Sequence, residues 1–224
     1  MCIRDSRCIA HLANDPGLIE AFTTGVDVHK ATAAKIYEIS LEDVTYEQRE
    51  YAKMVSYGLA YGMEAYGLGQ RLNIPTGEAQ VILDSYFKGF PAVQAYMDSS
   101  VEEAKERGYT MTLFGRRRSI PELHSPNFSV RAAAERQAMN AGIQGLAADI
   151  FKVAIIRVDE ALIEAGLSAR TVLQVHDEII IDTPVKEVDD VKELVETEMK
   201  AAFELKVPLE VNLESGKTWA DAKG

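Results

Sequence analysis

The chain changes its hydrophobic period once, near residue 170, and this change limits the folds open to it. Residues 170–175 and 178–182 are rich in β-branched and aliphatic side chains, and only His176 and Asp177 separate them. Two such runs spaced two residues apart predict an antiparallel hairpin with a tight turn. The segments before the hairpin are mainly helical in pattern, so the order predicts an α+β fold with a helical first part.

Turn residues and apolar spacing divide the helical part into several elements. Thr45 or Asp43 is a plausible N-cap for the helical region over residues 43–71. Gly142 and Gly145 are expected to bend or break the helix that contains them. Helices are expected over residues 43–71 (one or two helices), 78–89, 91–107, 129–144, 146–165 and 188–205, and short strands over 109–114 and 209–213.

The composition excludes several protein classes. The 224 residues are 47% hydrophobic and 26% charged, so the chain can bury a core and does not have the composition of a disordered tail. Cys2 and Cys8 are too few and too close to the N-terminus to staple a secreted domain, which makes a reducing cytoplasm the expected compartment. No apolar run approaches the ~18 residues of a membrane span, so no membrane partner is expected.

The net charge of −11 argues against nucleic-acid binding by the chain as a whole. However, residues 101–140 carry seven basic and five acidic side chains and form the only net-positive window. Because local rather than total charge attracts phosphates, this window remains a candidate for nucleic-acid contact.

Arg49, Lys53, Tyr57 and Tyr61 recur every four residues and therefore fall on one slowly drifting helical stripe. The two cations suit a polyphosphate, and the two rings suit stacking on a base or sugar. A surface helix with solvated cations and inward-packed rings would show the same residues, so the stripe alone leaves both interpretations open.

Two further constellations could carry chemistry. Arg136, Asn140 and Gln144 share one helix face and are side-chain types that hydrogen-bond base edges, although a solvated polar face would look alike. Asp177 and Glu178 are adjacent carboxylates at the hairpin turn and could ligate Mg²⁺, although Asp is also common in ordinary turns.

Taken together, five blocks in order resemble the DNA polymerases of family A, the bacterial DNA polymerase I type. Residues 49–62 resemble the fingers-helix motif, motif B, and residues 174–178 are similar to the palm hairpin, motif C. The resemblance runs from about Arg7 to the end of the chain. The other blocks are residues 112–118, 134–145 and 216–219.

The resemblance implies an incomplete polymerase hand of the α+β class. A helical fingers subdomain over residues 13–125 would be followed by an antiparallel-sheet palm with packed helices over residues 126–224. Residues 1–12 would be a remnant of the palm's motif A region with a non-matching start.

The resemblance also assigns nucleotide contacts. Lys53 would neutralise the triphosphate of an incoming dNTP and act as general acid toward pyrophosphate, with His29 and Arg49 also facing the triphosphate. Tyr57 would stack on the base and sugar, and a tyrosine there implies tolerance of dideoxynucleotides. Tyr61 would lie at the templating base.

Contacts to primer-template DNA and to metal follow in the same way. Asp177, with Glu178 beside it, would ligate catalytic Mg²⁺, of which the complete enzyme uses two ions. The side chains implied to contact DNA are Arg118, Arg131, Arg136, Asn140, Gln144 and His176. The complete enzyme is expected to be a monomer.

The start of the chain departs from the family pattern. The family's other metal-binding aspartate lies upstream of the arginine that Arg7 resembles, which would place it before Met1. Asp5 falls where the family has a glutamate that excludes ribonucleotides, but residues 1–6 otherwise show no likeness, so we treat this alignment as accidental. We therefore expect a C-terminal fragment, with a foreign or misread opening, that does not polymerise alone, although its parent would.

Three other functions remain open on the residues alone. A DNA- or nucleotide-binding module without catalysis would bind DNA in a salt-dependent way without requiring magnesium. A metal phosphohydrolase could use His176 and Asp177 but would leave the stripe at residues 49–61 unexplained. A helical interaction protein could use the acidic face of residues 188–205, although such faces are usually solvated.

Overall fold

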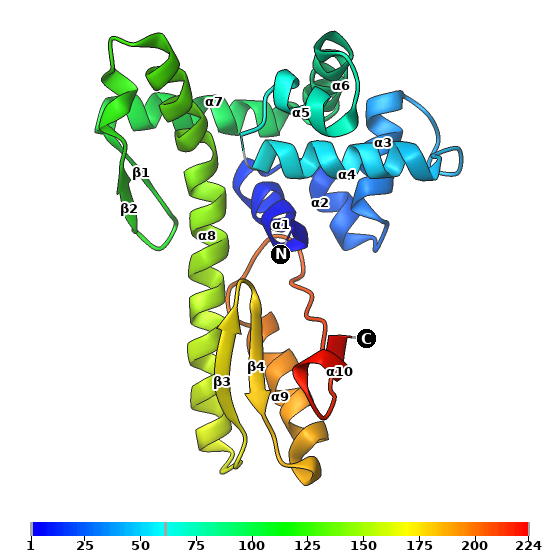
Figure 1. The fold of residues 1–224 in the computed structure, drawn as a ribbon, viewed down its shortest axis with the longest axis vertical. Coiled ribbons are helices and arrows are strands. Elements are labelled where there is room, and N and C mark those ends of the chain that lie inside the picture. Colours follow the sequence, from blue (N-terminus) through cyan, green and yellow to red (C-terminus); the bar gives the residue numbers. More distant parts are fainter. Residues whose placement is uncertain (1, 61, 224) are drawn as a thin grey trace. The chain divides into compact units, whose positions relative to one another are not determined.

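The computed structural model describes residues 2–60 and 62–223, which fall into two compact units (Figure 1). One unit comprises residues 2–146 and the other residues 147–223. The first is mainly helical and the second combines a β-hairpin with helices, which confirms the predicted α+β class. The predicted subdomain limits at residues 12 and 125 stay a prediction.

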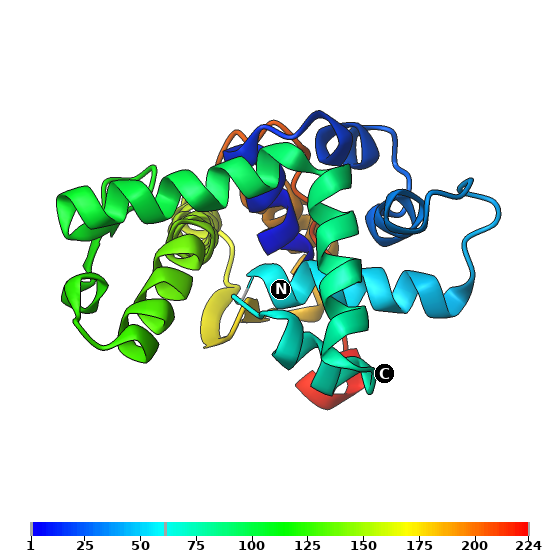
Figure 2. The same cartoon turned by 90° about the horizontal axis from the view of Figure 1, so that it is seen from above.

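The first unit is built from short helices that pack on one another. Helix α3 packs on α4 and α6, α5 packs on α6, and α1 contacts both α4 and α7. Figure 2 shows α6 and α7 meeting at a corner. The helices are α1 (Cys2–Ala13), α2 (Pro16–Thr23), α3 (Val28–Tyr37), α4 (Tyr46–Ala60), α5 (Ala65–Leu72), α6 (Thr76–Gly89) and α7 (Pro91–Arg107).

Local sequence signals explain where α4 begins and ends. Thr45 accepts a bond from Gln48 N, and the Gln48 side chain accepts one from Thr45 N, which forms a capping box and confirms Thr45 as the start. At the other end, Gly62 has φ +70° and donates to Leu59 O. This is the left-handed residue of a Schellman motif, so the expected helical region 43–71 is two helices.

After α7, a two-stranded hairpin leads into the longest helix. Strand β1 (Tyr109–Met111) pairs antiparallel with β2 (Arg117–Ser119). The strand expected over residues 109–114 is therefore shorter than predicted, because the chain must turn back at Gly115, which has φ +80°. A 3₁₀ turn, η1 (Pro121–His124), then precedes α8 (Phe128–Glu164).

Helix α8 is continuous for 37 residues, so Gly142 and Gly145, which were expected to bend or break it, do not break it. Both glycines instead allow close approach. A Cβ at position 145 would lie 2.5 Å from the Thr112 methyl group, and one at 142 would lie 2.5 Å from the Tyr96 hydroxyl. Neighbouring side chains thus occupy the space that a glycine leaves, and the helix continues because packing outweighs the low helix propensity of glycine.

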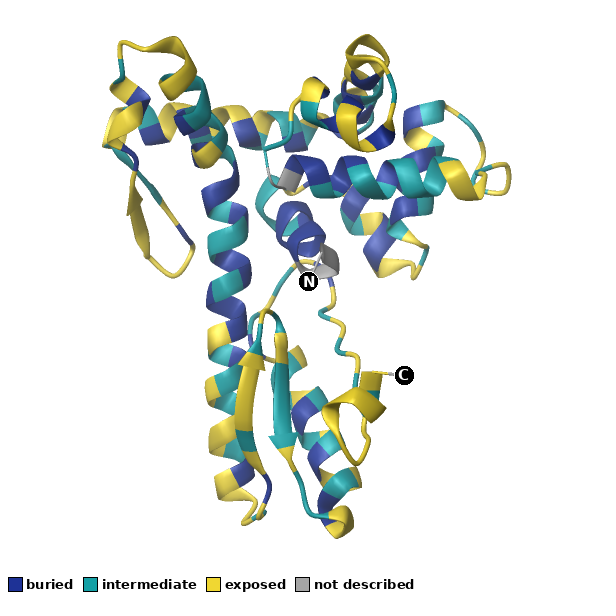
Figure 3. Cartoon of the chain, viewed as in Figure 1, coloured by how far each residue is buried: buried dark blue, intermediate teal, exposed yellow. Residues whose placement is uncertain are grey.

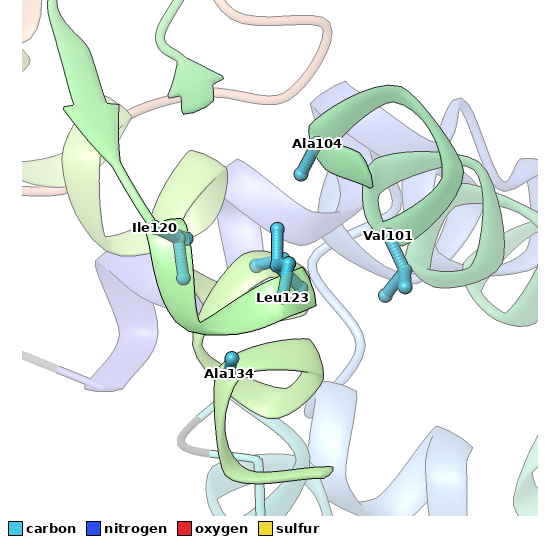
Figure 4. Packing of buried hydrophobic residues seen from close by; sticks show 6 residues of the cluster. Val101, Ala104, Ile120, Leu123 and Ala134 are labelled. Carbon is cyan, nitrogen blue, oxygen red and sulfur yellow. The ribbon is translucent and has the colours of Figure 1, made fainter. Parts of the chain in front are cut away.

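A small hydrophobic core anchors the segment between α7 and α8. Figure 4 shows side chains from α7, the turn after β2 and the start of α8 converging on Leu123, which is 2% exposed. Burial of such aliphatic groups typically stabilises a fold by about 1.5–3 kcal/mol each. The members are Val101, Ala104, Ile120, Leu123, Ala134 and Ala138.

The second unit contains the predicted hairpin. Strand β3 (Arg170–Val175) pairs antiparallel with β4 (Glu178–Asp182), with His176 and Asp177 between them, as expected. Figure 3 shows that β3 is exposed along most of its length while β4 is half-buried. The hairpin is followed by η2 (Val185–Glu187), α9 (Val188–Lys200) and α10 (Trp219–Lys223).

Its core forms where α8, α9 and the hairpin contribute apolar side chains. Val158 and Leu162 of α8 pack with Val191 and Val195 of α9, and Ile179 of β4 packs against them.

Two expectations for the C-terminal region are wrong. The helix expected over 188–205 ends at Lys200, and residues 209–213 form no strand. An alternating pattern becomes a strand only where a partner edge supplies hydrogen bonds, and the two strands described in this unit pair with each other.

Candidate functional site

The stripe predicted at residues 49–61 lies on α4, and a second helix contributes to it. Lys53 Nζ lies 5.9 Å from the centre of the Tyr57 ring. His29, in the first turn of α3, meets the same ring edge-on with 5.4 Å between ring centres. The structure thus brings His29, Lys53 and Tyr57 together as predicted, whereas Tyr61 lies outside the described residues.

Arg49 is held by two carboxylates. Its Nε and Nη2 atoms both donate to Asp27 Oδ2 at 2.8 Å, and Nη1 donates to Glu50 Oε1 at 2.6 Å. Glu50 also lies 3.9 Å from Lys53 Nζ. Ion pairs thus hold Arg49 in place, and Lys53 lies beside an aromatic ring, an arrangement suited to a phosphorylated ligand that carries a planar ring system.

Asp27 links the two helices, and the sequence interpretation gave it no role. Its Oδ1 accepts from the backbone N–H groups of His29 and Lys30, which caps α3, while Oδ2 binds Arg49. Burial raises its pKa, but the hydrogen bond from Arg49 and those from the backbone outweigh burial and leave the pKa below 3.8. The available signal was an N-cap aspartate two residues before a candidate histidine.

His29 is buried, with 5% of its surface exposed. Burial lowers its pKa to about 4; Asp27 opposes this effect, and the charges of Arg49 and Lys53 add to it. The ring is therefore neutral at pH 7. Its Nδ1 atom is buried and has no hydrogen-bond partner. His29 can thus offer a neutral polar nitrogen beside the two cations, but not a third positive charge.

The predicted polar face of α8 is present, but its members differ in exposure. Arg136 Nη1 forms an ion pair with Glu64 Oε1 at 3.0 Å. Asn140 is buried and donates from Nδ2 to Arg136 O at 2.7 Å, which leaves its buried Oδ1 without a partner. Gln144 is half-buried. The sequence interpretation did not include Glu64, since an isolated acidic residue before a helix carries no signal of its distant partner.

The predicted arginines of the basic window contact the chain near α8. Arg118 donates to the Gln137 side chain at 3.2 Å, and Arg131 donates to Ser125 O at 2.9 Å. Arg118 is exposed and Arg131 is half-buried. Both arginines lie in the same unit as Arg136.

The hairpin turn carries the predicted carboxylates. His176 has φ +53°, Asp177 is half-buried, and Glu178 Oε2 lies 3.0 Å from Lys223 Nζ. Across residues 2–60 and 62–223, no three His, Cys, Asp or Glu side chains gather as a metal-binding group. Mg²⁺ commonly takes only one or two protein carboxylates together with water and substrate phosphates, so Asp177 and Glu178 fit part of a magnesium site.

A match to a protein-family model establishes the relationship. Residues 5–221 match the model described as DNA polymerase family A. The chain belongs to DNA polymerase family A. It is 49% identical over 217 residues to DNA polymerase I of Geobacillus stearothermophilus and 50% identical over 215 residues to DNA polymerase I of Mycobacterium tuberculosis H37Rv. These alignments cover 97% and 96% of this chain but only 25% and 24% of the two relatives.

A solved structure gives the same family relationship. The polymerase domain of Pol1 from M. smegmatis, in complex with DNA primer-template and dNTP, matches with a TM-score of 0.92 and 48% identity. The match covers 99% of this chain and 39% of that one. In this family A chain, no helix within the described ranges is both long and apolar enough to span a bilayer.

Proposed function

We propose that this chain supplies nucleotide- and DNA-binding parts of a template-directed DNA polymerase, which transfers a nucleotide from a dNTP to a primer 3′-OH. The observation that carries the proposal is the array of His29, Arg49, Lys53 and Tyr57 on two helices joined by Asp27. The M. smegmatis polymerase domain, which was solved in complex with primer-template and dNTP, supports the choice of ligand.

Each member of the array would have its own task. Lys53 and Arg49 would neutralise the triphosphate, and Lys53 would donate a proton to the departing pyrophosphate. Tyr57 would stack on the base and sugar, and neutral His29 would hydrogen-bond a phosphate oxygen. Tyr61 would approach the templating base.

The other predicted residues would bind DNA and metal. Asp177, with Glu178, would hold Mg²⁺, which when bound activates the primer hydroxyl and stabilises the leaving group. Glu178 would have to exchange Lys223 for the cation. Primer-template contacts would come from Arg118, Arg131, Arg136, Asn140, Gln144 and His176.

We further propose that the 224-residue chain alone binds these ligands without extending a primer. Two-metal chemistry holds both ions about 4 Å apart, and we expect this to need a carboxylate from a second strand besides the adjacent pair at the hairpin turn. A labelled primer-template with dNTP and Mg²⁺ tests this directly. We expect binding without product, and primer extension by the isolated chain would overturn this part.

A chimera tests the polymerase function itself. Residues 5–221 would replace the matching segment of Geobacillus stearothermophilus DNA polymerase I. The chimera should extend a primer, and Asp177→Ala should abolish extension while leaving DNA affinity within about threefold. Asp182→Ala, at the exposed end of β4, is the matched control and should remain active. Retained extension in Asp177→Ala would remove this residue from the metal site.

A further inference from the structure

Glu64 lies where it can compete with DNA for Arg136. It is the N-cap residue of α5, yet its side chain makes no capping hydrogen bond. Its carboxylate instead contacts Arg136 Nη1 at 3.0 Å, across 72 positions of sequence. An acidic group at a helix N-terminus ordinarily gains from the free N–H groups there, so the side chain has exchanged that position for a cation on another helix.

The backbone just before Glu64 forms a hydrogen-bonded turn. In the Schellman motif that ends α4, Gly62 N donates to Leu59 O at 3.0 Å and Met63 N donates to Gly58 O at 2.8 Å. A fixed turn reduces the conformational entropy that an exposed ion pair would otherwise lose. Glu64 is therefore held near Arg136 by the course of the chain as well as by charge.

The same turn covers Asn140. A Cβ at Gly62 would clash with Asn140 Nδ2 and would lie 3.3 Å from Arg136 Cβ, so the backbone passes directly over both side chains. Asn140 keeps a buried Oδ1 with no partner, which is energetically unfavourable. Two side chains proposed to contact DNA thus lie against one short segment, residues 62–64.

We infer that Glu64 is an intramolecular competitor for DNA at Arg136 and weakens primer-template binding until a strand phosphate or base edge replaces it. This inference rests on the proposed DNA contact of Arg136. Removal of the carboxylate should then tighten DNA binding, because Arg136 no longer has to exchange one anion for another. Exposed ion pairs of this kind correspond to about two- to fivefold in affinity.

Fluorescence anisotropy of a labelled primer-template with the 224-residue chain at low salt is the test. We expect Glu64→Gln to tighten binding about two- to fivefold, with a smaller gain at higher salt. Glu64→Ser should act alike, because serine caps α5 but is too short to reach Arg136, and its thermal midpoint should be no lower. Glu20→Gln, an exposed glutamate of α2 outside the positive window, is the control for net charge alone.

Arg136→Gln separates the two proposals. Weaker binding by this variant, together with no effect of Glu64→Gln in its background, supports both. If Arg136→Gln binds more weakly but Glu64→Gln binds no better than Glu20→Gln, the DNA contact stands and the competition by Glu64 is overturned. Unchanged binding by Arg136→Gln overturns the DNA contact and the inference with it. Looser binding by Glu64→Gln means that Glu64 orients Arg136 and also overturns competition.

Discussion

The Asp27 carboxylate and the Arg49 guanidinium meet through two hydrogen bonds of 2.8 Å, and the same carboxylate caps α3. One side chain therefore starts the helix that carries His29 and also orients a cation on α4. This geometry places two of the proposed nucleotide contacts, His29 and Arg49, under the influence of a residue that is not itself proposed to touch the nucleotide.

Two substitutions of Asp27 should separate these roles. Asp27→Asn keeps the cap and loses the ion pair, so it should cost about 0.2–1 kcal/mol of unfolding free energy. Asp27→Ala loses both and should cost about 1–2 kcal/mol. Urea unfolding measures both values, and a double-mutant cycle with Arg49→Gln isolates the pair. Equal losses for the two variants would contradict a separate contribution from the cap.

The Asp27 carboxyl should also make stability depend on pH. Its pKa lies below the ordinary 3.8 in the folded chain, so the unfolded chain takes up the proton first as the pH falls. This contribution to stability is therefore complete above about pH 4 and is lost below it. The difference in unfolding free energy between the parent and Asp27→Asn should shrink across that range. A difference that stays constant down to pH 2 would contradict the shift.

His29 should lower stability in mildly acidic solution. Its pKa is about 4 in the folded chain because the ring is buried, against an ordinary 6.5. Between these values the unfolded chain binds the extra proton, so unfolding free energy falls as pH drops from 6.5 to 4, by at most ~1.4 kcal/mol per pH unit. His29→Leu should flatten this region of the profile. An NMR signal of His29 that titrates near pH 6.5 would refute the prediction.

Close packing at Gly145 should make alanine harmful there although α8 is helical. The Thr112 methyl group lies 2.5 Å from the position a Cβ would take, so Gly145→Ala should cost about 1–3 kcal/mol. Gly77→Ala in α6 is the matched control, because nothing lies within 4 Å and the change should stabilise by about 0.4–1 kcal/mol. Thermal unfolding of both variants gives the comparison, and a stabilised Gly145→Ala would contradict it.

The core around Leu123 should tolerate truncation poorly. Leu123 is 2% exposed, so Leu123→Ala should cost about 2–5 kcal/mol. Leu113 is 56% exposed in the loop between β1 and β2, and Leu113→Ala should stay within about 0.5 kcal/mol. Urea unfolding of the two variants tests the contrast, which would fail if their midpoints were the same.

Elements with strong local signals were predictable from the sequence. The hairpin turn at His176 and Asp177 needed only two β-rich runs at fixed spacing, and α7 lies between Pro91 and Gly108, which mark helix ends. The strand predicted over residues 209–213 is absent, because an alternating pattern does not reveal whether the edge of another strand is available for pairing. The break predicted at the glycines of α8 is absent because these glycines make room for the side chains of Thr112 and Tyr96, which the local sequence does not show.

The candidate site shows the same division. The four-residue spacing placed Arg49, Lys53 and Tyr57 on one helix without any structure. The spacing could not show that Asp27 would pair with Arg49. It also gave no sign that Glu64 would pair with Arg136 of α8, because both contacts join residues distant in sequence.

The close approach of Tyr96 of α7 to Gly142 of α8 makes the residue allowed at one position depend on the residue at the other. The Tyr96 hydroxyl occupies the place of a side chain at 142, so alanine there becomes compatible only when the hydroxyl is gone, as in phenylalanine. Among related sequences we therefore expect positions 96 and 142 to covary, with a tyrosine accompanied by glycine and any bulkier residue at 142 accompanied by a shorter partner.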